Sequence, residues 1–222
     1  MTTTGPLIPM NSVMNLRAAL THLSQAGLAE EMLSHPALRR GKCWLAQDFI
    51  ILAHPHQEPP AGANGGGPWT TWLVLGGRGA GKTRLGAEWV RAVANGTPPY
   101  SDGRCFSIAL VGETEHDARE VMIEGPSGLL RISPREERPL WMPSRRRLEW
   151  PNGAVGMVFS AEDPEQLRGP QFDAAWCDEL AKWTHVEATF DMLQFGLRLG
   201  MVSPLALMTT TTSLPTQQFD AY

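Results

Sequence analysis

The sequence lacks any long hydrophobic run. None of its apolar segments approaches the ~20 residues that a helix needs to span a bilayer. Residues 1–5 also lack the basic-then-apolar layout of a signal peptide. Both absences predict a soluble, intracellular protein without a membrane partner.

Cysteine is scarce, and charge of one sign does not dominate. Cys43, Cys105 and Cys177 lie far apart and lack the paired spacing of a zinc site or a disulfide framework, so a reducing cytoplasm is the simplest interpretation. The formal net charge of −4 provides no global attraction to nucleic acid. Any contact with DNA therefore has to be local.

The length of 222 residues and the 42% share of hydrophobic residues suit one sizeable core with an appendage. Within residues 11–32 leucines recur at roughly helical spacing, and residues 43–53 are a further candidate helix. The Gly- and Pro-rich segment 59–68 (PPAGANGGGP) is the clearest linker. We therefore predict an N-terminal helical segment (1–58), a linker (59–68) and a core domain (69–222).

Short apolar strands alternate with helices along this core. Such alternation predicts an α/β fold with a mainly parallel sheet and helices on both faces. Pro151-Asn152-Gly153, between two short runs rich in apolar residues, predicts an antiparallel hairpin within residues 148–160. The predicted strands are 71–75, 107–111, 172–177 and 205–209; the predicted helices are 84–94, 114–122 (with Thr114 and Asp117 as a capping box) and about 186–199.

The segment GGRGAGKT, directly after the first predicted strand, matches the phosphate-loop pattern G-x-x-x-x-G-K-[ST]. Glycines let main-chain N–H groups turn inward to bind phosphates, and the following helix adds the positive end of its dipole. The lysine is expected to reach the β and γ phosphates, and the threonine hydroxyl to ligate Mg²⁺. The alternative is a glycine-rich turn beside a lysine, but the strand–loop–helix context favours nucleotide binding. The predicted site comprises Gly76, Gly77, Arg78, Gly79, Ala80, Gly81, Lys82 and Thr83.

A second strand is expected to bring carboxylates to this loop. Asp178-Glu179 follows an apolar strand, and ligands bind at the carboxyl ends of strands in open α/β sheets. We interpret Asp178 as the Mg²⁺ carboxylate and Glu179 as the group that polarises the attacking water, although an isolated Asp-Glu pair is more typical of a solvated helix start. No [NT]-K-x-D guanine-reading motif occurs, which favours ATP over GTP. The predicted fold class is a P-loop NTPase of the ASCE (RecA-like) kind.

Five stretches of the chain carry a more extended pattern, and the long block that ends in Lys182-Trp183 is far more specific than a phosphate loop alone. They are WLVLGGRGAGKTRLGAEWV, VMIEGPSGLL, PSRRRLEWPNGA, FSAEDPEQLRGPQFDAAWCDELAKW and LALMTTTT. Together they resemble the large terminase subunits of tailed phages, and most closely the packaging ATPases of phage-like gene transfer agents and related prophages. The resemblance covers about residues 53–211.

The resemblance implies roles for five further residues. Arg78 matches an arginine that senses or stabilises the γ-phosphate, and Arg168 matches one that reaches the ATP of a neighbouring subunit. Thr210 and Thr211 match a motif that couples loss of the γ-phosphate to domain movement. Gln57 matches a glutamine that reads adenine. Plainer alternatives are a salt bridge at the following turn for Arg168 and a β-branched strand end for the threonines.

The resemblance also implies a motor that hydrolyses ATP with Mg²⁺ to move double-stranded DNA into a capsid. Such motors are rings, implied here to be pentameric, that work with a portal protein and a small terminase subunit in the cytoplasm of a bacterial host. The alternatives are a helicase- or recombinase-like ATPase and a nucleotide-binding remnant without turnover. Relatives carry a nuclease domain after the ATPase, whereas this chain stops at Tyr222, so no nuclease activity is expected.

The densest basic segment is Arg145-Arg146-Arg147, with Arg135 and Arg138 nearby. It flanks the predicted hairpin. Such a patch suits contact with a phosphate backbone, and equally a solvated or subunit-facing surface.

Overall fold

The computed structural model describes residues 49–97, 100–101, 103–199 and 205–210. The chain divides into two compact units, Met1–Glu58 and Pro59–Tyr222. In the first unit the described residues form the short helix α4 (Phe49–Leu52) and the 3-10 helix η2 (Pro55–Gln57). The helices predicted within residues 11–32 lie outside the described residues, as does most of the one predicted for 43–53.

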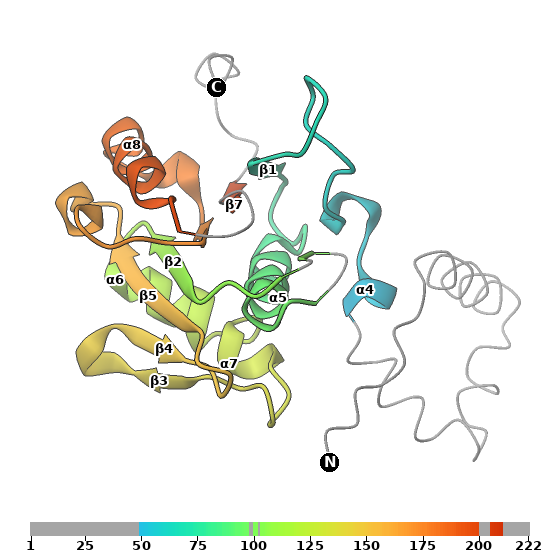
Figure 1. The fold of residues 1–222 in the computed structure, drawn as a ribbon, viewed down its shortest axis with the longest axis horizontal. Coiled ribbons are helices and arrows are strands. Elements are labelled where there is room, and N and C mark those ends of the chain that lie inside the picture. The colour runs from blue at the N-terminus through green and yellow to red at the C-terminus, as the bar shows by residue number, and fades with distance from the viewer. Residues whose placement is uncertain (1–48, 98–99, 102, 200–204, 211–222) are drawn as a thin grey trace, which may run out of the picture. The chain divides into compact units, whose positions relative to one another are not determined.

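Strands of the second unit form one seven-stranded sheet in the order β1-β7-β6-β2-β5-β4-β3 (Figure 1). The strands from β1 to β5 in this order run parallel, β4 pairs with β5 in the antiparallel sense, and β3 pairs with β4 in the antiparallel sense. The predicted α/β class with a mainly parallel sheet is thus confirmed. The strands are β1 (Thr71–Leu75), β2 (Ser107–Gly112), β3 (Leu140–Met142), β4 (Arg147–Glu149), β5 (Val155–Ser160), β6 (Ala174–Cys177) and β7 (Leu205–Thr210).

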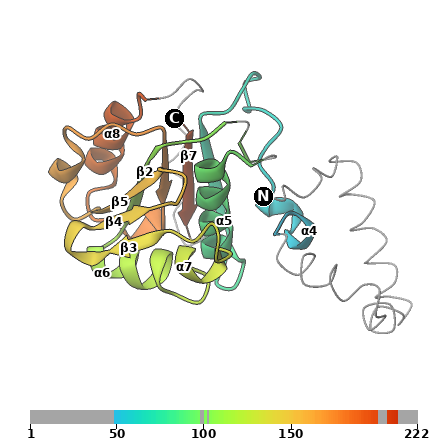
Figure 2. The same ribbon diagram turned by 60° about the horizontal axis from the view of Figure 1, so that its bottom comes forward.

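Helices cover both faces of this sheet, as β6 illustrates. Trp176 packs against α5 (Lys82–Asn95), where an ideal Cβ at Gly86 would lie 2.0 Å from its Cε2. Cys177 points the other way and shares a core cluster with Leu193 of α8 (Val186–Gly196). Figure 2 shows α5 and α8 flanking the central strands. The remaining helical segments are α6 (Glu115–Asp117), η3 (Ala118–Ile123), α7 (Leu129–Ile132), η4 (Pro143–Arg145), η5 (Pro164–Leu167) and η6 (Leu180–Lys182).

The helix α5 confirms the predicted helix 84–94 and begins at Lys82. Its apolar stripe, Leu85, Trp89 and Val93, is fully buried. Burying each such side chain contributes roughly 1.5–3 kcal/mol, which explains why this face is held against the sheet. The helix ends at Gly96, whose left-handed φ of 68° lets its N–H bond back to the carbonyl of Ala92.

The predicted hairpin is present between β4 and β5. Trp150 donates its N–H to the carbonyl of Ala154 over 2.9 Å, and Gly153 in the turn has a φ of 90°. The side chain of Asn152 donates from Nδ2 to the carbonyl of Ala94 over 2.8 Å. The turn is therefore held against the end of α5.

The segment after β2 differs in part from its prediction. Thr114 does cap the helix, because its Oγ1 accepts the N–H of Asp117 over 3.0 Å. Only α6 is an α-helix, however, and the chain continues through η3 as a π-helix. Such segments occur mostly as short insertions in α-helices. The apolar pattern predicted a helix here but could not distinguish its hydrogen-bond register.

No helix in the described ranges is long and apolar enough to cross a membrane. Two of the thiols, those of Cys105 and Cys177, are free and buried. Burial raises the pKa of Cys105 to about 12 and also raises the pKa of Cys177. Both residues therefore serve as small core side chains, without the thiolate that reactive cysteines need.

Candidate nucleotide-binding site

Residues 76–81 form the loop between β1 and α5, at the carboxyl end of β1, and residues 82–83 of the predicted phosphate-binding segment begin α5. Gly79 and Gly81 have φ values of 79° and 76°. Residues with a side chain rarely adopt this backbone conformation. Gly81 is also the N-cap of α5. The first N–H groups of a helix have no partner within it, so this tight loop suits a cradle of donors for phosphate.

Lys82, the first residue of α5, lies at the centre of the site. Its side chain is 7% exposed, and Nζ donates to the carbonyls of Gly76 and Gly77 over 3.0 and 3.1 Å. Nζ also lies 3.6 Å from Oε1 of Glu179. The ammonium group thus joins the predicted phosphate loop to the predicted acidic pair.

Asp178 follows β6 directly and is 6% exposed. Its N–H donates to the carbonyl of Val111 over 2.9 Å, and its carbonyl accepts the indole N–H of Trp183 over 3.1 Å. Burial raises the pKa of the Asp178 carboxyl, while the hydrogen bond from Thr209 opposes that rise. Hydrogen bonds therefore fix both the main-chain groups and the carboxylate of Asp178.

Glu179 has a strained backbone. Its φ of 51° and ψ of 46° lie in the left-handed region, which is uncommon for a residue with a side chain. Its Oε1 faces Lys82, and its Oε2 is buried without a hydrogen-bond partner. Strain of this kind concentrates at functional sites, and an unpaired buried carboxylate oxygen is a place for a ligand or a water.

These residues fit a magnesium ion. Mg²⁺ is usually bound by one or two carboxylates together with waters and substrate phosphates, without a full cage of protein ligands. Thr83 at the start of α5 and Asp178 supply a hydroxyl and one carboxylate. In the described part of the chain, no group of three or more His, Cys, Asp or Glu side chains is placed to hold a metal.

Thr209 is a site residue that the sequence did not single out. Its Oγ1 donates to Oδ1 of Asp178 over 2.5 Å from the neighbouring strand β7. The next residue, Thr210, accepts the N–H of Ala181 at Oγ1 and the N–H of Gly76 at its carbonyl, over 2.9 and 3.2 Å. The threonine run signalled this region, but only the tertiary structure shows that the hydroxyl of Thr209 meets Asp178 and that of Thr210 meets the main chain at Ala181. Thr211 lies outside the described residues.

The remaining candidates lie at the surface or in the other unit. Arg78 is exposed within the loop. Arg168 is 68% exposed and forms an ion pair with Glu165 over 3.0 Å, a geometry compatible with either role predicted for it. Gln57 belongs to the first unit, where its Oε1 accepts the N–H of His54 over 2.9 Å. The adenine-reading role of Gln57 stays a prediction.

Two of the three clustered arginines face carboxylates. Arg146 pairs with Glu115 over 2.7 Å, and Arg147 pairs with Glu149 over 2.8 Å. These pairs offset part of the local positive charge. Arg145, Arg135 and Arg138 are exposed. Contact of this patch with DNA stays a prediction.

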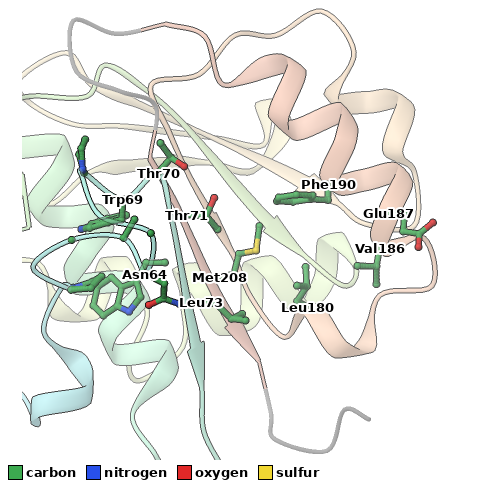
Figure 3. Close-up of a pocket in the computed structure, with 16 residues that line it drawn as sticks. Asn64, Trp69, Thr70, Thr71, Leu73, Leu180, Val186, Glu187, Phe190 and Met208 are labelled. Atoms are coloured by element: carbon green, nitrogen blue, oxygen red, sulfur yellow. The ribbon is translucent and has the colours of Figure 1, made fainter. Parts of the chain in front are cut away.

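A pocket of about 740 Å³ lies beside β1, between the segment around Trp69 and helix α8 (Figure 3). Apolar side chains such as Leu73, Met208 and Phe190 line it. Neither the phosphate loop nor the acidic pair takes part in its lining. None of the residues predicted to bind nucleotide or metal therefore lines the pocket, although Leu180, the neighbour of Glu179, does.

A mainly parallel sheet with a phosphate loop after one strand and an acidic pair after another defines the P-loop NTPase fold. The chain belongs to the family of terminase large subunits (T4likevirus-type, N-terminal region), whose model matches residues 73–219. A comparison with curated proteins finds no match.

Solved structures of phage terminases are similar to this chain. The ATPase domain of the large terminase of Thermus phage P74-26 shares 18% identity with a TM-score of 0.44, over 64% of this chain and 59% of that one. The large terminase of a thermophilic bacteriophage, solved in complex with ADP, shares 14% identity with a TM-score of 0.49, over 76% of this chain and 37% of that one. The chain thus spans less than two thirds of either solved structure.

Proposed function

We propose that this chain is the ATPase part of a DNA-packaging motor, which hydrolyses ATP with Mg²⁺ to drive double-stranded DNA into a capsid. The observation that carries the proposal is the position of the Lys82 ammonium. It lies between the carbonyls of the phosphate loop and the carboxylate of Glu179, 3.6 Å away. Membership of the terminase family supports DNA as the object that is moved.

Each residue of the proposed site has its own role in hydrolysis. Main-chain N–H groups of the loop after Gly76 and the ammonium of Lys82 bind the phosphates. Glu179 orients the attacking water and accepts its proton, while Arg78 adds positive charge beside the transferred phosphate. When bound, Mg²⁺ neutralises phosphate charge, with Thr83 and Asp178 as its protein ligands.

The hydrogen bonds of Thr210 support a role in transmitting structural change from the nucleotide site to the rest of the motor. One residue accepts hydrogen bonds both from the phosphate loop, at Gly76, and from the segment after Glu179, at Ala181. A movement of either segment after phosphate release would therefore displace Thr210 at the end of β7. We assign coupling to Thr210, with Thr211 directly after it.

Substituting Lys82 tests the catalytic claim. We expect Lys82→Ala to lower the rate of phosphate release from ATP by at least ~10²-fold, as loss of one charged donor to a transition state does. Arg131→Ala, which removes an exposed cation on α7, is the matched control and should hydrolyse ATP at the wild-type rate. Chelation of Mg²⁺ by EDTA should abolish the wild-type rate. Equal rates for wild type and Lys82→Ala would remove the claim.

We further propose that the chain works in a ring with a portal protein and a small terminase subunit, and that Arg168 completes the site of its neighbour. Its 68% exposure supports a role toward another subunit. Arg168→Ala is expected to lower hydrolysis by the assembled ring ~10³-fold and to leave ATP binding unchanged.

Mixing two inactive variants tests this trans role. Subunits with Arg168→Ala keep their own Glu179, and subunits with Glu179→Ala keep Arg168, so neighbours in a mixed ring complement each other. Phosphate release should therefore return on mixing. No recovery, under conditions in which wild-type subunits assemble, would rule out an arginine that acts in trans.

A further inference from the structure

A series of contacts connects the phosphate-loop helix to Asp178 through two residues of the core. Gly86 lies four residues after Lys82 on α5, so both belong to the same helix face. The indole of Trp176 occupies the space where a side chain at Gly86 would lie, with Cε2 and Nε1 only 2.0 and 2.4 Å from an ideal Cβ. Trp176 therefore rests directly on the helix that carries the phosphate loop.

The same indole hydrogen-bonds to the neighbouring strand. Trp176 donates from Nε1 to Oγ1 of Thr209 over 3.3 Å. Both side chains are fully buried, so neither group has water as an alternative partner. This bond occupies one acceptor position of the threonine oxygen.

The hydroxyl of Thr209 has two acceptors within reach but only one proton. The carbonyl of Cys177 lies at 3.3 Å, and Oδ1 of Asp178 lies at 2.5 Å. Hydrogen bonds to a carboxylate are shorter and roughly twice as strong as those between neutral groups. The proton is therefore directed to Asp178.

We infer that Trp176 and Thr209 are positioning residues, which orient the Asp178 carboxylate relative to the phosphate-loop helix so that it can act as a magnesium ligand. The inference rests on the proposed function. Partners that hydrogen-bond to a metal ligand typically change metal affinity by 10- to 100-fold when they are removed. A bond that only stabilised the core would change the unfolding temperature and leave metal dependence alone.

The test measures ATP affinity by calorimetry twice for each variant of the full chain, once with Mg²⁺ and once with EDTA. Thr209→Val keeps the shape of the side chain and removes its hydroxyl. It should weaken ATP binding in Mg²⁺ roughly 10- to 100-fold and leave binding in EDTA unchanged, because the loop and Lys82 remain. Thr209→Ser restores the hydroxyl and should restore binding in Mg²⁺.

Two tryptophan substitutions form a matched pair. Trp176→Phe removes the N–H that fixes the Thr209 oxygen, so the hydroxyl is oriented less firmly toward Asp178, and a several-fold loss of ATP binding confined to Mg²⁺ is expected. Trp89 is also fully buried, but its Nε1 has no hydrogen-bond partner. Trp89→Phe should therefore leave the dependence on Mg²⁺ at the wild-type level.

The outcomes separate this inference from the proposed function. Wild-type dependence on Mg²⁺ in Thr209→Val would overturn the inference while the proposed function stood. The same dependence of ATP binding on Mg²⁺ in Trp176→Phe and Trp89→Phe would also overturn the inference. This comparison remains informative even if Thr209→Val fails to fold. A wild-type chain that bound no ATP under either condition would overturn both together.

Discussion

Replacing Glu179 by glutamine should abolish hydrolysis and preserve ATP binding. The amide matches the carboxylate in size but cannot accept the proton of the attacking water, and general-base catalysis typically contributes 10²- to 10⁴-fold. We therefore expect phosphate release to fall by about that factor. Binding should persist because Lys82 and the loop are unchanged, and Lys82 is freed from a carboxylate that lies 3.6 Å away.

The measurement pairs steady-state phosphate release with equilibrium ATP binding on the same preparations. Glu136→Gln, at an exposed glutamate outside the site, is the matched control and should hydrolyse ATP at the wild-type rate. A fully active Glu179→Gln protein would assign the base to another group. A protein that lost ATP binding as well would instead indicate that Glu179 holds the loop in shape.

Replacing Gly86 by alanine should destabilise the protein. In an ordinary helix this change gains about 0.5–1 kcal/mol, because alanine loses less conformational freedom on folding. Here the new Cβ would lie 2.0 Å from the ring of Trp176, which is fully buried and cannot move aside freely. Overpacking of a dense core costs ~1–3 kcal/mol, so the steric effect exceeds the gain.

Urea unfolding followed by circular dichroism measures the balance. We expect a lower midpoint for Gly86→Ala, with a net loss on the order of 1–2 kcal/mol. Gly65→Ala is the control, because an ideal Cβ at Gly65 meets nothing within 4 Å. If Gly86→Ala raised the midpoint, the contact between α5 and Trp176 would have to be looser than the structure places it.

Elements with a strong local pattern were predictable. The strand β1, the helix α5 and the hairpin at Gly153 each carry their own signal: an apolar run, a periodic stripe and a turn sequence. The strand β3 was missed because it has only three residues and forms by pairing with β4 at the edge of the sheet. Its stability comes from a partner strand, which no local pattern reveals.

The sequence by itself determined the components of the site. The loop around Lys82 and the pair Asp178-Glu179 follow from spacing and from the rule that parallel strands end at one edge. Only the tertiary structure placed β7 between β1 and β6, and with it the hydroxyl of Thr209 on Asp178. The physical reason is that strand order is decided by packing between distant segments, whereas periodicity records only which face of each segment is buried.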